Sequence, residues 1–149
     1  MPAIGPSRFE AGSHNISALA GLNEGVKWLN ATRRDVIHAR VAEITSYLIN
    51  ALTELPGVEL FLPNEMSRHH GVVSFAVGGV EPQALETVLG ARDVAVRAGL
   101  HCAPWTHEFM GTLARGGIVR VSPGYFNSVD DVAALTTLVQ HTVAKDGSA

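Results

Sequence analysis

The residues best suited to chemistry lie in one short stretch, where Cys102 follows His101 and comes five residues after Arg97. A cationic neighbour favours the thiolate form of a cysteine, and the thiolate is the nucleophilic form. Gly99, in the same stretch, permits the tight backbone that such a loop requires. A lone cysteine is also common as a small buried hydrophobic residue. The stretch therefore predicts a reactive thiol at Cys102, with a purely structural cysteine as the alternative.

Two arginines occupy unusual positions for a charged residue. Arg120 lies inside a short apolar run, and Arg97 ends another one. A guanidinium among apolar residues needs an anionic partner, because burying an unpaired charge costs free energy. Its planar fork suits bidentate binding of a carboxylate. The arginines are therefore candidates for binding a substrate carboxylate, with an internal salt bridge or an exposed strand face as the alternatives.

The histidines and the cysteine are possible metal ligands, but their spacing does not indicate a metal site. None of them shows the Cys-x-x-Cys or His-x-x-x-His spacing that marks zinc sites. The residues concerned are His69, His70, His101, Cys102 and His107. Glycine-rich motifs for nucleotide phosphates are also missing from the sequence. We therefore expect neither a metal nor a nucleotide.

Composition indicates a globular chain of about one domain. It has 149 residues, of which 46% are hydrophobic, and a net charge of −3. The slightly acidic balance argues against nucleic acid as a partner, and no apolar run approaches the ~20 residues that cross a membrane. One cysteine cannot form an internal disulfide, and the first residues do not resemble a secretory signal. A cytoplasmic location is expected.

Hydrophobic periodicity predicts the elements that must position these residues. Capping-box patterns at Thr32 and Ser128 mark two helix starts. The order of elements predicts an α/β fold, a short mixed sheet covered by helices, with the reactive stretch in a long loop after the third strand. Helices are expected over 16–30, 32–55, 82–91 and from 128 onward, and strands over 58–62, 71–77, 94–97 and 118–122.

Two motifs, in this order, resemble the cysteine desulfurase and selenocysteine lyase group of class V aminotransferase-fold enzymes. The first is Arg-Phe-Glu-Ala-Gly-Ser-His-Asn at 8–15, and the second is Val-Arg-Ala-Gly-Leu-His-Cys-Ala-Pro at 96–104. The second motif continues with Thr-His at 106–107, Gly-Thr-Leu at 111–113 and Val-Arg-Val-Ser at 119–122. The resemblance implies the small C-terminal α/β domain of a pyridoxal-phosphate-dependent transferase fold at 32–149. Residues 1–31 would be a lead-in segment and helix from the junction with the large domain.

The resemblance also implies roles at a substrate site. Cys102 matches the nucleophile that takes sulfur from a cysteine-like amino acid, leaving an enzyme persulfide and alanine. Arg120 matches the arginine that holds the substrate α-carboxylate, and Arg97 and His101 line the same site. The implied activity is that of a cysteine desulfurase. The alternatives are another class V activity or a non-catalytic interaction module derived from the family.

The implied cofactor is pyridoxal phosphate, which acts as an electron sink for the bound amino acid. Gly12 and Ser13 match the residues that reach the cofactor of the partner subunit in the family's homodimer. The family's Schiff-base lysine has no counterpart, because neither Lys27 nor Lys145 lies in the corresponding motif. We therefore expect no covalent cofactor binding and no turnover by this chain alone.

The resemblance finally implies partners. They would be a chain that carries the large domain, a sulfur acceptor protein, and further copies in a homo-oligomer. An exposed apolar patch within residues 1–31 is expected, because in the family the small domain rests on the large one.

Overall fold

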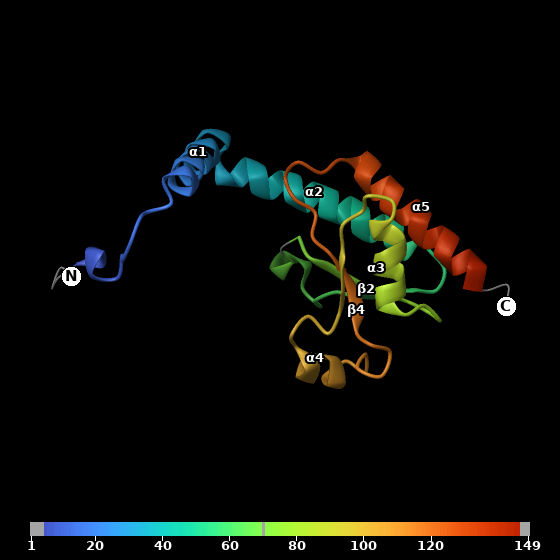
Figure 1. The fold of residues 1–149 in the computed structure, drawn as a ribbon. Helices are drawn as coiled ribbons and strands as arrows, with labels where there is room; N and C mark the ends of the chain where they lie inside the picture. Colours follow the sequence, from blue (N-terminus) through green and yellow to red (C-terminus); the bar gives the residue numbers. More distant parts are fainter. Residues whose placement is uncertain (1–4, 70, 147–149) are drawn as a thin grey trace. The chain divides into compact units, whose positions relative to one another are not determined.

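The computed structural model describes residues 5–69 and 71–146, without the side chains of residues 7, 68 and 144–146 (Figure 1). The chain divides into two compact units, residues 1–37 and 38–149. Each unit is described by itself. The predicted domain boundary after residue 31 stays a prediction.

The first unit contains a 3-10 helix, Pro6–Arg8, and helix α1, Ile16–Thr32. Asn15 caps α1, because its side-chain oxygen accepts a hydrogen bond of 3.0 Å from the backbone N–H of Ala18. No residue of α1 is buried. The expected apolar patch is therefore present on this helix. Its large exposed hydrophobic residues are Ile16, Leu19, Leu22, Val26, Trp28 and Leu29.

Helix α2, Arg34–Thr53, begins later than the sequence pattern predicts. Thr32 is the last residue of α1, and Arg33 follows it with a left-handed φ of 70°. Asp35 does not complete a capping box with Thr32. It forms an ion pair with Arg33 instead, at 2.7 Å between Nη2 and Oδ2. The predicted helix start at Thr32 is wrong, because α1 continues through Thr32 and the break between the two helices falls at Arg33.

The second unit is built on a four-stranded sheet with the order β1-β2-β4-β3. The strands are β1 (Val58–Phe61), β2 (Val73–Val77), β3 (Arg97–Gly99) and β4 (Ile118–Val121), with a 3-10 helix, Met66–Arg68, between the first two. The α/β class is confirmed, but every pairing is antiparallel, so the prediction of a mixed sheet is wrong. Strands β2 and β3 run in the same direction. Because β4 lies between them, they do not pair with each other.

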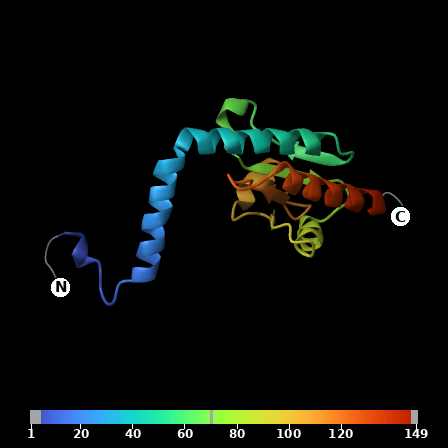
Figure 2. The same cartoon turned by 90° about the horizontal axis from the view of Figure 1, so that it is seen from above.

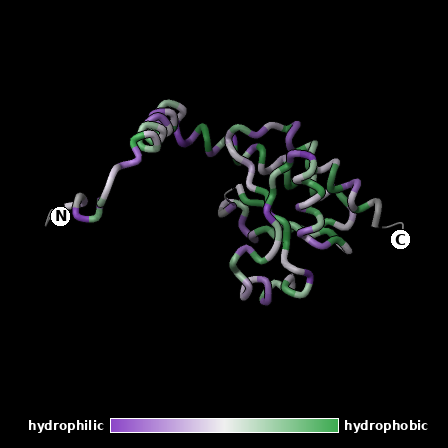
Figure 3. The backbone as a smooth tube through the Cα atoms, in the orientation of Figure 1, coloured by the Kyte–Doolittle hydropathy of each residue, from purple (hydrophilic) through white to green (hydrophobic). Residues whose placement is uncertain are grey.

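One face of this sheet is covered by α2, α3 (Pro82–Gly90) and α5 (Val129–Asp146), as Figures 1 and 2 show. Side chains alternate between the two faces of a strand. Val73, Phe75 and Val119 point into the core beneath the helices, where hydrophobic residues predominate (Figure 3). The residues between them, such as Ser74 and Arg120, therefore belong to the opposite face.

Helix α5 begins at the predicted capping box. The backbone N–H of Ser128 donates to Asp131 Oδ2 at 2.8 Å, and the N–H of Asp131 donates to Ser128 Oγ at 3.3 Å. The bond from the Ser128 backbone is the main cause of a pKa of Asp131 below its ordinary value. The predicted helix start at Ser128 is confirmed.

The region around β3 differs from the prediction. The strand begins at Arg97 and not at Val94, because only residues 97–99 pair with β4. The Val94 N–H bonds to the carbonyl of Leu89 at the end of α3. The expected long loop contains a further helix, α4 (Pro104–Phe109). Proline in the first turn of a helix is a known start signal, and it was missed here.

Candidate active site

Cys102 lies in a tight turn that follows β3 directly. The Ala103 N–H donates to the carbonyl of Leu100 at 2.9 Å and closes the turn. Both central residues are left-handed, His101 with φ 51° and Cys102 with φ 59°. This conformation costs roughly 1–2 kcal/mol for each residue that is not glycine. The turn is therefore held by its surroundings, and it leaves Cys102 exposed.

Arg97 and Arg120 lie directly opposite each other on β3 and β4. Residues in such a pair share one face of the sheet, with Cβ atoms about 5 Å apart. The arginines therefore stand together on the face away from the core. Within the described part of the chain, neither guanidinium forms a hydrogen bond or an ion pair. Like charges directly opposite each other are destabilising, so the pair forms a positive site that lacks a counter-charge.

A third arginine near the same face is compensated. Arg115 Nη1 lies 2.8 Å from Glu59 Oε2, and its guanidinium lies 5.7 Å from the centre of the Phe61 ring. Glu59 and Phe61 are on β1, and Phe61 belongs to the same cross-strand row as Arg120. The contrast shows that the sheet has a carboxylate for Arg115 but offers none to the pair beside Cys102.

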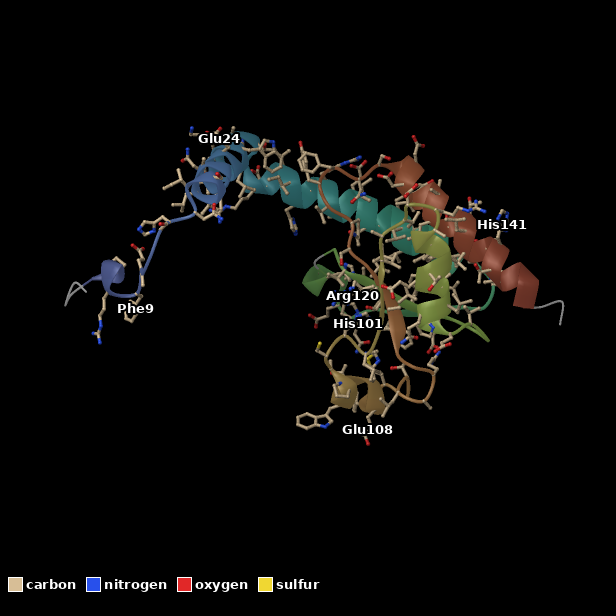
Figure 4. The ribbon with its side chains drawn as sticks, viewed as in Figure 1. Phe9, Glu24, His101, Glu108, Arg120 and His141 are labelled. Carbon is tan, nitrogen blue, oxygen red and sulfur yellow. The ribbon has the colours of Figure 1, made fainter. Side chains whose placement is uncertain are left out.

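His101 lies in the turn, close to Arg120 (Figure 4). The pKa of His101 lies below its ordinary value, first because burial disfavours the charged ring and second because Arg120 is close. Arg97 and His107 act in the same direction, and a hydrogen bond with the Ile118 backbone opposes them. His101 Nε2 is buried and has no hydrogen-bond partner among the described residues. The lowered pKa favours the neutral form of this ring beside the arginines.

A buried polar pair lies behind this turn, and sequence reasoning missed it. His107 in α4 and Thr112 after it are 3% and 0% exposed. His107 Nδ1 and Thr112 Oγ1 are 2.7 Å apart. The ring centre of His107 lies 6.0 Å from that of His101. Both residues fall within the stretches that carry the family resemblance, but a single sequence cannot show that they contact each other.

The hollows described in the second unit do not coincide with the candidate site residues. Three hollows of the second unit have volumes of about 520, 180 and 530 Å³. None of them is lined by Cys102, His101 or either of the paired arginines. Cavity volume therefore does not indicate the site. The left-handed turn at His101 and Cys102 does, together with the two arginines that lack a counter-charge among the described residues.

The residues of the first unit do not fit pyridoxal phosphate as a covalent site. Lys27 Nζ lies 2.7 Å from Glu24 Oε1 on an exposed surface of α1, and the side chain of Lys145 lies outside the described residues. Gly12 and Ser13 are exposed, and a Cβ atom added at Gly12 would meet nothing within 4 Å. Gly12 and Ser13 belong to residues 1–37, and the substrate-site candidates to residues 38–149.

Two further findings concern the described residues only. They contain no group of three His, Cys, Asp or Glu side chains that could hold a metal ion. Among their helices, none combines the length and the apolar character needed to cross a membrane.

Comparison with known proteins gives the family. A model of the aminotransferase class-V family matches residues 3–135, which includes the turn, both paired arginines and the His107–Thr112 pair. This chain belongs to that family. Enzymes of the family depend on pyridoxal phosphate. The resemblance expected from the two motifs is confirmed.

Three of the similar proteins are named as cysteine desulfurases, one of them as a probable one. A probable cysteine desulfurase of Staphylococcus aureus (strain COL) is 32% identical over 137 residues, which are 92% of this chain and 32% of that protein. The apo structure of a cysteine desulfurase from Thermococcus onnurineus NA1 matches with a TM-score of 0.80 and 31% identity, over 94% of this chain and 34% of the other. A cysteine desulfurase of Escherichia coli in an S-sulfonic acid form has a TM-score of 0.77 and 25% identity, over 94% and 33%. The chain spans about a third of the length of these relatives.

Proposed function

We propose that this chain supplies the substrate-facing, thiol-bearing part of a pyridoxal-phosphate-dependent cysteine desulfurase. The observation that carries the proposal is the unpaired Arg97–Arg120 pair beside the turn that exposes Cys102. The relatives named as cysteine desulfurases support it. The substrate would be L-cysteine or a similar amino acid, whose carboxylate is the anion that the arginines lack.

The roles of the residues follow from their positions. Arg120, which is half-buried, would hold the substrate carboxylate, and the exposed Arg97 would be its second cation. Two guanidinium groups on one face can bind a carboxylate through several charge-assisted hydrogen bonds. His101 Nε2 would be a further hydrogen-bonding group for the bound substrate. Gly12 and Ser13 would contact the cofactor in an assembled homodimer.

The proposed reaction transfers one sulfur atom. The Cys102 thiolate forms a bond to the substrate sulfur while the bond from that sulfur to carbon breaks. The electron pair stays with the carbon atom, which takes up a proton to give alanine. Cys102 is left as a persulfide, which a sulfur acceptor protein would then use. The cofactor's chemistry, that of an electron sink, would come from the two-thirds of the relatives that this chain does not span, so the chain alone would not turn over.

The carboxylate site can be tested on this chain directly, because Cys102 is the only cysteine. Iodoacetate and iodoacetamide alkylate the same thiol, but only iodoacetate carries a carboxylate. We expect Cys102 to react faster with iodoacetate, relative to iodoacetamide, than a cysteine in an unstructured peptide does. Arg120→Gln should remove this preference.

Arg115→Gln is the matched control, because Arg115 has the same charge but pairs with Glu59. It should leave the preference within about twofold, since exposed ion pairs contribute little. Equal preferences in wild type, Arg120→Gln and the unstructured peptide would contradict the proposed site. That outcome would favour the non-catalytic interaction module instead.

A further inference from the structure

The turn that contains Cys102 is followed directly by a helix that is too short to be stable by itself. Helix α4 has six residues, and isolated helices of fewer than ~12 residues are marginal in water. Its start is bonded to the turn, because the N–H groups of Thr106 and His107 donate to the carbonyl of Ala103. Any movement of α4 is therefore passed to the turn.

The other end of α4 is fixed by the His107–Thr112 pair. The His107 carbonyl accepts hydrogen bonds from the N–H groups of Thr112 at 2.8 Å and of Leu113 at 3.2 Å. The side chains add the 2.7 Å contact between His107 Nδ1 and Thr112 Oγ1. The carbonyl of Thr112 in turn accepts from the N–H of Gly117, directly before β4. A continuous series of hydrogen bonds therefore joins β4 to the turn.

This series accounts for the left-handed residues of the turn. A conformation that costs free energy persists only where the surrounding structure determines it. The closing bond from Ala103 to Leu100 determines it from within, and α4 determines it from the far side. The His107 ring also faces His101, at 6.0 Å between ring centres.

We infer that Thr112 and His107 are positioning residues for Cys102, holding the turn so that its thiol faces the carboxylate site. The inference rests on the proposed function. Neither residue touches the reacting atoms in this assignment. Their effect passes through α4 and the backbone of Ala103.

Thr112→Val tests the inference, because valine has nearly the same shape but lacks the hydroxyl group. The substitution removes the 2.7 Å contact with His107 Nδ1 and a longer bond of 3.4 Å that Thr112 Oγ1 donates to the His107 carbonyl. We expect the iodoacetate preference of Cys102 to fall by about fivefold, the factor that corresponds to ~1 kcal/mol of lost hydrogen bonding. Exchange of the Ala103 amide hydrogen should accelerate by a similar factor. Thr112→Ser keeps the hydroxyl group and should restore both values to within about twofold of wild type.

Thr45→Val is the matched control. Thr45 is 3% exposed, and its hydroxyl group donates to the Val41 carbonyl within α2, so this variant loses a threonine hydrogen bond away from the turn. It should lower stability without changing the preference of Cys102 or the relative exchange rate of Ala103. The inference would be overturned if Thr45→Val and Thr112→Val changed the iodoacetate preference of Cys102 and the exchange rate of Ala103 equally. It would also be overturned if Thr112→Ser did not keep both quantities near their wild-type values.

The two proposals can fail separately. If wild-type Cys102 shows no iodoacetate preference, the proposed carboxylate site is wrong. The exchange rate of Ala103 then decides the inference by itself. Faster exchange in Thr112→Val than in Thr112→Ser and Thr45→Val supports positioning of the turn, and equal exchange in all three contradicts it.

Discussion

At Gly117, an added methyl group should destabilise the pairing of β3 with β4 and disturb the candidate site. It precedes β4, with φ 103°. A Cβ atom added there would lie 2.2 Å from the carbonyl oxygen of Gly99 and 3.0 Å from its Cα atom. Both neighbours are backbone atoms, so no side chain can rotate away. The strands would have to separate by about 0.8 Å to reach the 3.0 Å that real Cβ atoms keep.

The neighbouring Gly116 provides the control for the cost of conformation alone. Its φ is 80°, but an added Cβ atom would meet only the flexible Gln83 side chain, at 3.5 Å. Gly116→Ala should therefore cost the left-handed penalty, roughly 1–2 kcal/mol. Gly117→Ala should cost that penalty and also disrupt the pairing of β3 with β4. Losing two ladder hydrogen bonds at ~1 kcal/mol each makes the difference between the variants about 2 kcal/mol.

Urea unfolding followed by circular dichroism measures this difference. With a denaturant slope of ~2 kcal/mol per M, the midpoint of Gly117→Ala should lie about 1 M below that of Gly116→Ala. The iodoacetate preference of Cys102 should fall as well in Gly117→Ala, because β3 carries Arg97. Equal midpoints for the two variants would refute the close approach of Gly99 and Gly117.

Further outcomes are expected for the core, the α5 cap, His101 and Lys27. Phe75→Ala, at a fully buried position, should lower the free energy of unfolding by ~3–5 kcal/mol in urea titrations, whereas Ser128→Ala should cost ~1 kcal/mol through loss of the α5 cap. NMR titration should give His101 a pKa below 6.5, and Arg120→Gln should raise it, because a positive neighbour is removed; an unchanged value would place the two groups apart. Since the folded pKa is the lower one, the neutral ring stabilises the fold above pH 6.5, and this contribution should be lost as the pH falls through the folded pKa. Treatment with pyridoxal phosphate and borohydride should leave Lys27 without a stoichiometric adduct by intact mass, because that lysine has no cofactor pocket around it.

The sequence was most informative where a local pattern had no competitor. The capping box at Ser128 and the proline that opens α3 act within one turn of helix, and both were predicted correctly. At Thr32 the same pattern failed, because α1 continues through that residue and the break between the helices falls at Arg33. A local capping pattern does not show whether the preceding helix has already ended.

The candidate site residues could be named from the sequence, but their arrangement could not. Cys102, His101, Arg97 and Arg120 were all recognised as candidates. That the two arginines stand opposite each other depends on the register of β3 with β4, and residues 20 or more positions apart in the sequence give no local signal of it. The antiparallel order of the sheet escaped prediction for the same reason. His107 and Thr112 are five residues apart, but the sequence does not show that α4 ends between them and that their side chains meet.

Side chains alternate along β4, so neighbouring residues of this strand serve the core and the candidate site in turn. Val119 packs into the core, and Arg120, the next residue, lies on the opposite face of the sheet. A deletion of one residue between Gly117 and Arg120 would exchange the two faces, since side chains repeat with a period of two. A guanidinium would then enter the core while a valine replaced it at the site. Loops generally tolerate changes of length, but we expect a one-residue deletion in this strand to disrupt the core and the proposed carboxylate site together.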